Sequence, residues 1–160
     1  MTDNERLAEL LFPNISWTPQ QYEEQYPARQ LPEGARVTRF SPSPTGYLHI
    51  GGLFAAMTAR LTAKATNGVF FLRIEDTDKK REVEGGVTAI VTGLAAFGIT
   101  PDEGITGLGT ESGVYGPYQQ SKRREIYQCF AKELVRQGLA YPCFCTEAEL
   151  TALREQQEAQ

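Results

Sequence analysis

The residues best suited to chemistry lie in one short stretch, from Ser41 to Gly52. It holds the only histidine of the chain, His49, and the glycine pair Gly51-Gly52. An apolar segment precedes the stretch and a helical pattern follows it, which predicts a strand, a turn and a helix start. The first N–H groups of a helix lack partners within the helix and attract anions. We therefore expect a phosphate-binding turn whose imidazole donates a hydrogen bond to a phosphate oxygen.

The turn itself is built to be rigid. Pro42 and Pro44 each fix φ, and Gly46 permits a sharp change of direction. Gly51 and Gly52 carry no Cβ, so a flat purine or a phosphate can approach the backbone closely. A histidine with a glycine pair also fits an ordinary surface turn, so the interpretation depends on what else the sequence places nearby.

The remaining sequence predicts an α/β fold in which strands and helices alternate. A strand, a helix and a strand within residues 35–74 form a βαβ unit, which is right-handed by rule. The glycine-rich residues 100–117 predict a loop. The elements that we expect are strands at 35–40, 69–74 and 139–144, and helices near the N-terminus, at 50–66, 81–97 and 121–137, and from Thr146 onward. The expected helix caps are Asp3 or Asn4 for the first helix, Ser121 for the helix at 121–137, and a capping box of Thr146 and Glu149 for the last.

Two charged residues end the first two predicted strands. Open α/β sheets bind ligands at the carboxyl ends of their strands, so Arg39 and Glu75 should face one cleft. A guanidinium can hold a carboxylate by two parallel hydrogen bonds, and a carboxylate suits an ammonium group. Asp76 and Asp78 are expected to shape the following loop through Asx turns.

Four segments, in this order, resemble the glutamyl form of the class I aminoacyl-tRNA synthetases. They are Arg39–Gly46 with His49–Gly52, then Leu72–Asp78, Gly116–Ser121 and Tyr141–Cys145. The resemblance spans residues 36–154 and implies a Rossmann-like class I catalytic half-domain with parallel strands, followed by the start of an inserted subdomain.

The resemblance also implies roles for individual residues. Arg39 would recognise the glutamate side chain and Glu75 its α-amino group, with Ser43 also touching the amino acid. Ser41 stands where alanine is common in the family, so its contact with glutamate is less well defined. His49 would stabilise the adenylation transition state. The residues implied for ATP are Pro44, Thr45, Gly46, His49, Gly51 and Gly52.

By this resemblance the partners are glutamate, ATP with Mg²⁺, and tRNA(Glu). The odd count of three cysteines and the polar start of the chain predict a reduced cytoplasmic protein. We expect an N-terminal extension at 1–34, the first half of the catalytic domain at 35–115, and a further helix with the start of the insertion at 116–160. The family pattern begins near Arg36, which makes the extension a departure from it. Its prolines suggest a surface clasp, anchored by Trp17, Tyr22 and Tyr26, and a contact with a partner is the alternative.

Several features suggest a fragment of a longer enzyme. The family's second ATP signature, a KMSKS-type loop, does not occur in the sequence. Tight binding of tRNA is expected to depend on regions absent from this chain, since the formal net charge of −4 is a poor fit to gripping nucleic acid by charge. No apolar run is long enough to span a membrane and no secretory signal opens the chain.

The cysteines leave a metal site open. Cys143 and Cys145 supply half of the four ligands that structural zinc needs, and Cys129 lies on a predicted helix. The resemblance implies that zinc, if present, belongs to an intact protein with further ligands downstream. Otherwise the pair would be two reduced thiols in a buried strand.

Three alternatives to a glutamyl ligase remain. A glutamyl-queuosine-type paralogue usually differs at the positions of Ile50, Gly52 and Thr77. A glutaminyl enzyme usually has another turn in place of residues 41–45 and an aspartate-type second strand, against which Glu75 argues. A non-catalytic binding module derived from a synthetase is the third.

Overall fold

A computed structural model describes residues 1–159 and divides the chain into two compact units. One unit comprises residues 17–127, and the other combines residues 1–16 with the chain from residue 128 onward. The predicted boundaries at residues 34/35 and 115/116 come from the family pattern and not from the compactness of the chain, and they stay a prediction. Across residues 1–159, no helix combines the length and the apolarity that crossing a bilayer demands.

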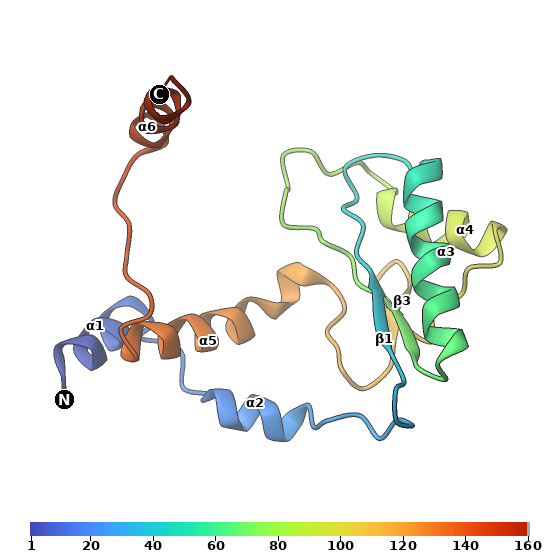
Figure 1. The fold of residues 1–160 in the computed structure, drawn as a ribbon, viewed down its shortest axis with the longest axis horizontal. Helices are drawn as coiled ribbons and strands as arrows, with labels where there is room; N and C mark the ends of the chain where they lie inside the picture. Colours follow the sequence, from blue (N-terminus) through green and yellow to red (C-terminus); the bar gives the residue numbers. More distant parts are fainter. Residues whose placement is uncertain (160) are drawn as a thin grey trace. The chain divides into compact units, whose positions relative to one another are not determined.

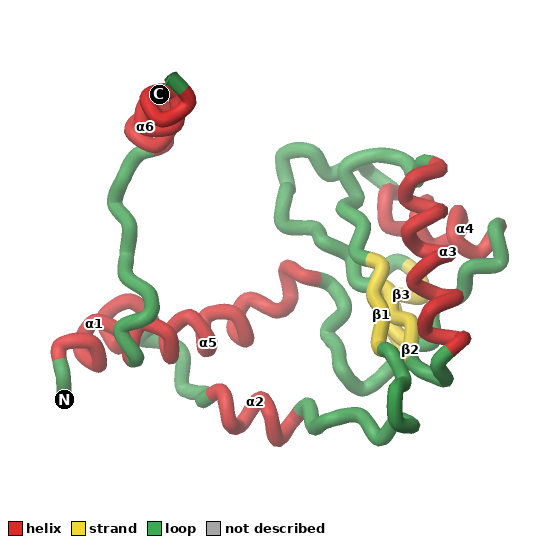
Figure 2. The backbone as a smooth tube through the Cα atoms, viewed as in Figure 1, coloured by secondary structure: helices red, strands yellow, loops and turns green. Residues whose placement is uncertain are grey.

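The larger unit is built on a four-stranded sheet with the order β1-β2-β3-β4 (Figures 1 and 2). The first three strands run parallel and the last is antiparallel to its neighbour. Parallel strands need long crossovers, and helices α3 and α4 supply them. The bounds are β1 Val37–Phe40, α3 Ile50–Ala65, β2 Val69–Leu72, α4 Gly86–Ala96, β3 Glu103–Gly107 and β4 Thr110–Ser112.

The core lies between the sheet and these two helices. Side chains of a strand alternate between its faces, so Phe70 and Leu72 of β2 point to one side and are about 1% exposed. They pack with Ile90 and Leu94 of α4 and with Ala56 of α3. The α/β fold predicted from the sequence is therefore confirmed, and the carboxyl ends of the parallel strands meet at one edge.

Glycine is required where this sheet is drawn together most tightly. A Cβ added at Gly68 would lie 1.9 Å from the carbonyl oxygen of Arg36, just before the paired starts of β1 and β2. A Cβ at Gly104 would lie 2.1 Å from the carbonyl oxygen of Leu72, and Gly104 also has a φ of +120°. Neither site tolerates a side chain without displacing a neighbouring strand.

The prediction of a loop over residues 100–117 was wrong, because β3 and β4 form a hairpin there. Its two arms join at Gly109, whose φ of +71° suits a tight turn. The helix predicted from Arg81 begins only at Gly86. Val83 is held instead by the carbonyl oxygen of Pro44, which accepts its N–H at 2.8 Å.

The chain after the sheet also differs from the prediction. Ser121 does not cap a helix, because its amide and hydroxyl both bind Asp76, and the chain first forms the 3-10 turn η1. No strand forms at 139–144, where the described chain offers no partner strand for pairing. The elements in this region are η1 Gln120–Arg123, α5 Arg124–Arg136 and α6 Glu147–Glu158.

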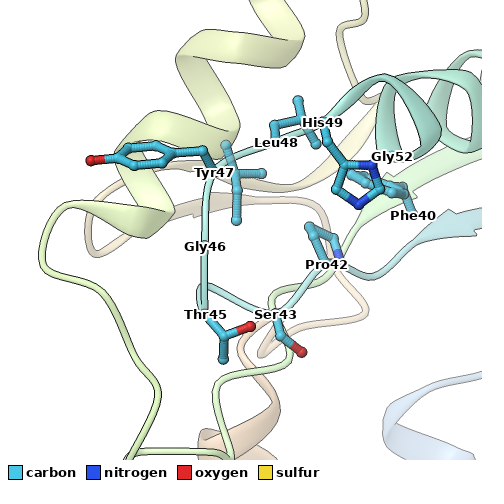
Figure 3. Close-up of a pocket in the computed structure, with 10 residues that line it drawn as sticks. Phe40, Pro42, Ser43, Thr45, Gly46, Tyr47, Leu48, His49 and Gly52 are labelled. Carbon is cyan, nitrogen blue, oxygen red and sulfur yellow. The ribbon is translucent and has the colours of Figure 1, made fainter.

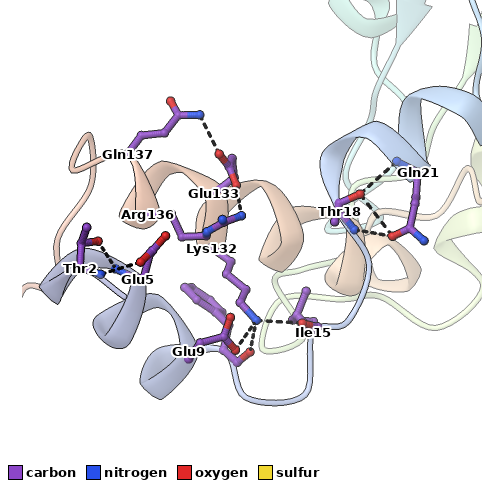
Figure 4. A network of polar contacts seen from close by, with 11 residues as sticks. Thr2, Glu5, Glu9, Ile15, Thr18, Gln21, Lys132, Glu133, Arg136 and Gln137 are labelled. Atoms are coloured by element: carbon purple, nitrogen blue, oxygen red, sulfur yellow. Dashed lines mark hydrogen bonds and ion pairs between the residues drawn. The ribbon is translucent and has the colours of Figure 1, made fainter.

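The smaller unit contains α1 (Asp3–Leu11), which Thr2 caps rather than Asp3 or Asn4. In this unit the Lys132 side chain, which is 12% exposed, makes several polar contacts (Figure 4). The ammonium group donates to the Glu9 carboxylate at 2.8 Å and to two carbonyl oxygens, of Phe12 and Ile15. The Lys132 ammonium group thus provides a hydrogen-bond donor for carbonyl oxygens at the C-terminal end of α1 and in the residues that follow it. Thr146 caps α6 with Glu149 in the predicted capping box.

Residues 17–34 belong to the larger unit and carry the helix α2 (Pro19–Gln25), with a capping box between Thr18 and Gln21 (Figure 4). Of the three predicted anchors, Tyr26 lies with its ring centroid 6.4 Å from that of Tyr115. The rings of Trp17 and Tyr22 lie against each other, with their centroids 4.9 Å apart.

The close approach at Gly68 generates a stability prediction. Gly68→Ala should lower the free energy of unfolding by about 2–3 kcal/mol, because the added methyl group collides with a backbone carbonyl that cannot move alone. Gly46→Ala is the matched control, since nothing lies within 4 Å of its added Cβ, and it should change stability by less than about 0.5 kcal/mol. Urea unfolding followed by circular dichroism compares the two, and equal losses would contradict the role given to Gly68.

Candidate active site

A pocket of about 290 Å³ opens at the predicted phosphate-binding turn (Figure 3). Its size is at the lower end of the range for small-molecule sites. Figure 3 shows the turn as an open loop, with the Ser43 and Thr45 hydroxyls at one end and the His49 imidazole at the other. The pocket is lined by Phe40, Pro42, Ser43, Thr45, Gly46, Tyr47, Leu48, His49, Gly52 and Ile90.

The histidine stands at the start of α3. His49 is the N-cap residue of the helix, and its side chain makes no capping hydrogen bond. The imidazole lies over Gly51, where an added Cβ would be 3.0 Å from the ring atom Cε1. An exposed ring beside the open N–H groups of a helix start can donate to an anion that binds there.

Pro44, Gly51, Ser41, Arg39 and Glu75 do not line this pocket. Pro44 is buried and serves the turn through its carbonyl oxygen, which accepts the N–H of Val83. Gly51 lies beneath the imidazole, and Ser41 is half-buried in the turn.

Main-chain hydrogen bonds join the first two motifs. The Glu75 N–H donates to the Pro42 carbonyl oxygen at 3.0 Å, and the Arg73 N–H donates to that of Phe40 at the same distance. The pairing of β1 with β2 therefore continues beyond the strands into both loops. It places Glu75 directly beside Pro42, a residue of the pocket wall.

Arg39 and Glu75, which are expected to face one cleft, lie within ion-pair distance of each other. Arg39 Nη2 lies 4.0 Å from Glu75 Oε1, and Arg73 Nη2 lies only 2.9 Å from the same oxygen. Arg73 is a site residue that the sequence reasoning missed. The available signal was its spacing, since residues two apart on a strand share a face. The Glu75 side chain is 29% exposed, and within residues 1–159 its second oxygen has no hydrogen-bond partner.

Asp76 forms the most buried polar centre near the site, with none of its side chain exposed. Its carboxylate accepts hydrogen bonds from the Ser121 hydroxyl at 2.6 Å and the Ser121 amide at 2.9 Å. Gln119 donates at 2.8 Å and Lys79 at 3.0 Å. The expectation of a purely local Asx turn is therefore wrong, because Asp76 ties the second motif to the third.

The charge state of Asp76 follows from these contacts. Burial raises the pKa of Asp76, but the hydrogen bonds from Ser121, Lys79 and Gln119 outweigh burial and lower the pKa to about 2. The main chain of the second and third motifs also pairs directly. Ile74 and Gln119 form a parallel bridge, in which the Ile74 N–H donates to the Tyr118 carbonyl oxygen at 2.9 Å. The first three motifs are thus joined at one edge of the sheet.

The fourth motif forms no metal centre by itself. Cys143 and Cys145 are both exposed, not in a buried strand, and hydrogen bonds from Cys145 lower the pKa of Cys143. Among residues 1–159, no three His, Cys, Asp or Glu side chains gather closely enough to hold a metal ion. Two thiols are half of the set that structural zinc requires, so the present residues do not fit zinc alone.

Comparison with known proteins decides the family. The catalytic domain of class I tRNA synthetases (E and Q) matches residues 36–160. The chain belongs to this synthetase family. The match covers all four motifs and the whole sheet, so the resemblance drawn from the motifs is confirmed.

Two curated relatives and one solved structure illustrate the similarity. Glutamate–tRNA ligase of Clostridium perfringens strain 13 is 55% identical over 156 residues, which are 98% of this chain and 29% of the relative. That of Acetivibrio thermocellus is 52% identical over 159 residues. A crystal structure of glutamate-tRNA synthetase from Elizabethkingia anophelis has a TM-score of 0.67 at 44% identity, covering 79% of this chain and 25% of that one. The chain thus spans between a quarter and a third of these proteins.

The comparisons bear on residues 1–34 in two ways. The family match begins at residue 36, where the family pattern was expected to begin. The match to the Clostridium perfringens relative covers 98% of the chain and so includes most of residues 1–34. Glutamate–tRNA ligase of Clostridium tetani, in contrast, matches over 122 residues, or 76% of this chain. The length of this chain that is matched therefore differs between members of the synthetase family.

The lowered pKa of Asp76 predicts acid-dependent stability. A depressed pKa stabilises the fold above the unfolded value of 3.8, and that contribution is lost as the pH falls from about 4 to about 2. Its size is about 2 kcal/mol. Asp76→Asn removes the titrating group, so the stability difference between wild type and variant should shrink over this range.

Urea unfolding at several pH values between 7 and 2 measures that difference. Asp3→Asn, at an exposed position, is the matched control and should change the free energy of unfolding by less than about 0.5 kcal/mol. A gap between wild type and Asp76→Asn that stays constant down to pH 2 would contradict the assignment.

Proposed function

We propose that this chain supplies the part of a glutamate–tRNA ligase that binds glutamate and ATP and forms glutamyl-adenylate. The single observation that carries the proposal is the joining of the two motifs. A main-chain hydrogen bond holds Glu75 beside Pro42, and Arg39, in the strand that leads into the phosphate-binding turn, lies within ion-pair distance of Glu75. Opposite charges at one edge suit an amino acid that carries both signs.

Glutamate would be held by charge complementarity. The exposed Arg39 guanidinium suits the side-chain carboxylate by paired hydrogen bonds. Glu75 keeps one oxygen open for the α-ammonium group, while Arg73 fixes the other. Ser41 and Ser43 add hydroxyl groups from the turn between Arg39 and the pocket. Arg73 thereby acts as a positioning residue for Glu75.

ATP would occupy the turn and the helix start. Thr45, Gly46, His49 and Gly52 line the pocket, Pro44 fixes its backbone, and Gly51 leaves room for the imidazole. The α-carboxylate oxygen of glutamate attacks the α-phosphorus, the bond to the bridging oxygen breaks, and pyrophosphate leaves. Mg²⁺ bound to the triphosphate would offset its negative charge. His49 donates a hydrogen bond to the α-phosphate as charge builds there. No nucleophile from the protein takes part.

Transfer to tRNA(Glu) completes the proposed reaction. The terminal ribose hydroxyl attacks the glutamyl carbonyl carbon, and AMP leaves. A KMSKS-type loop does not occur in the 160 residues, so most tRNA contacts and part of the ATP site are assigned to a longer protein. The proposal places that protein in the cytoplasm, with any zinc held by Cys143, Cys145 and further ligands.

A ligand-binding experiment tests the proposal on the chain itself. A sulfamate analogue of glutamyl-adenylate should bind at least tenfold more tightly than the glutaminyl analogue, because Arg39 would lose its charged partner. Isothermal titration calorimetry of both analogues gives the ratio. Preference for the glutaminyl analogue would favour a glutaminyl enzyme, and binding of neither would favour a non-catalytic module.

The role of Arg39 predicts that its removal weakens binding of the glutamyl analogue much more than binding of ATP. Arg39→Ala should weaken the glutamyl analogue about 10- to 100-fold, because a charge-assisted contact is lost. Its effect on ATP should stay within about twofold, since Arg39 does not line the pocket. Arg36→Ala, at an exposed arginine before β1, is the control and should alter neither affinity. Equal losses for both ligands would show that Arg39 has been misassigned.

Catalysis by the 160 residues alone is expected to be absent. Without a KMSKS-type loop, the triphosphate lacks the second group of cations that the family uses. Pyrophosphate exchange with glutamate, ATP and labelled pyrophosphate should therefore stay at background. Exchange above background from the purified chain would contradict this part of the proposal.

A further inference from the structure

The segment before β1 reaches the glutamate side of the site through a chain of charged and aromatic contacts. Arg29 and Glu103, the first residue of β3, form a two-pronged ion pair, with Nη2 donating to Oε2 at 2.7 Å. Both side chains are 17% exposed. A partly buried pair of this geometry is oriented by two hydrogen bonds, which a surface ion pair seldom is.

Aromatic contacts hold Arg29 in that position. Its guanidinium lies over the Tyr115 ring, with the central carbon 3.8 Å from the ring centroid. The Tyr115 hydroxyl donates to the carbonyl oxygen of Pro27 at 2.8 Å, two residues before Arg29. A cation on an aromatic face adds to the ion pair and restricts the guanidinium to one plane.

The contacts continue from Glu103 into the third motif. The Tyr118 hydroxyl donates to Glu103 Oε2 at 2.7 Å and accepts the Tyr115 N–H at 3.1 Å. The Tyr118 residue is 2% exposed. Burial and the hydrogen bond to Glu103 raise the pKa of Tyr118 to about 12, so its hydroxyl remains a donor at neutral pH.

The main chain at Tyr118 then fixes the second motif. The Tyr118 carbonyl oxygen accepts the Ile74 N–H at 2.9 Å, and the Gln120 N–H donates to the Ile74 carbonyl oxygen at 2.8 Å. Ile74 is fully buried and immediately precedes Glu75. Each link from residue 29 to residue 75 is therefore a hydrogen bond or a peptide bond.

We propose that Arg29 is a positioning residue for the glutamate site, acting through Glu103 and Tyr118 on the backbone that carries Glu75. The proposal rests on the function proposed above for Glu75. It gives residues 17–34 a specific task within their own unit, beyond that of a surface clasp. It also predicts that relatives lacking an equivalent of Arg29 hold Glu103 or Tyr118 by other means.

Amide exchange tests the mechanical part without any ligand. In Arg29→Met, NMR hydrogen exchange at the Ile74 and Gln120 amides should accelerate about 3- to 30-fold. The Leu53 amide of α3 should keep its wild-type rate. Glu103→Gln retains an acceptor for Tyr118 but loses the charged pair, and it should shift the same two amides in the same direction. Arg36→Met is the matched control.

Ligand binding tests the functional part. Arg29→Met should weaken the glutamyl-adenylate sulfamate about 3- to 30-fold while leaving ATP affinity within about twofold, and Arg29→Lys should recover part of the loss. Combining Arg29→Met with Tyr118→Phe should cost less than the product of the single effects, because both break one chain of contacts.

The outcomes distinguish a failure of the role proposed for Arg29 from a failure of the proposed function on which it rests. If the wild-type chain binds neither adenylate analogue, the proposed function fails, while the exchange rates still decide whether Arg29 controls Ile74. Unchanged exchange at Ile74 and Gln120 in both variants would overturn the proposal. Equal losses of analogue and ATP affinity would overturn it as well, since general destabilisation affects both ligands.

Discussion

The buried carboxylate of Asp76 is the interaction on which the site edge of the sheet depends. A charged group removed from water is stable only where donors replace the lost hydration. Asp76 has four, and three of them come from Gln119 and Ser121, which are more than forty residues away in sequence. The carboxylate can keep its charge only if the third motif lies against the second. This one requirement holds residues 119–121 against the end of β2.

The position of Glu75 depends on the same contacts between the second and third motifs. Its neighbours on the chain, Ile74 and Asp76, are both tied to residues 118–121. Arg73, two residues before Glu75 and just after β2, then holds one of its carboxylate oxygens at 2.9 Å. Backbone and side chain are thus both fixed before any substrate arrives. Preorganisation of this kind lowers the entropy cost of binding a small charged ligand.

The strands and helices that the sequence revealed are those with long, uninterrupted patterns. β2 is a continuous apolar run and α3 is followed by Asn67-Gly68, where Asn67 adopts a positive φ. β3 escaped notice because glycines at 104 and 107 interrupt it, and its place is fixed by pairing with β2 and β4. The segment 139–144 has a strand-like composition but no described partner. Strand formation depends on such partners as much as on composition.

The sequence likewise predicted part of the candidate site, namely the part that depends on motifs and on the geometry of parallel strands. The turn from Ser41 to Gly52 and the approach of Arg39 to Glu75 followed from motifs and from the geometry of parallel strands. Arg73, Ser121 and Gln119 did not, because their importance lies in contacts with residues whose own positions had first to be known. The side chain of Ser121 illustrates the point, since its local sequence suits a helix cap and its distant partner decides otherwise.

The loops at the site are joined mainly by main-chain hydrogen bonds, from Glu75 to Pro42, from Val83 to Pro44 and from Ile74 to Tyr118. Such bonds depend little on which side chains the loops carry. Evolution could therefore exchange the groups that recognise a ligand while the frame beneath them keeps its shape. One scaffold of this type can give rise to enzymes for different amino acids, and the divergence would be recorded in a handful of outward-facing positions.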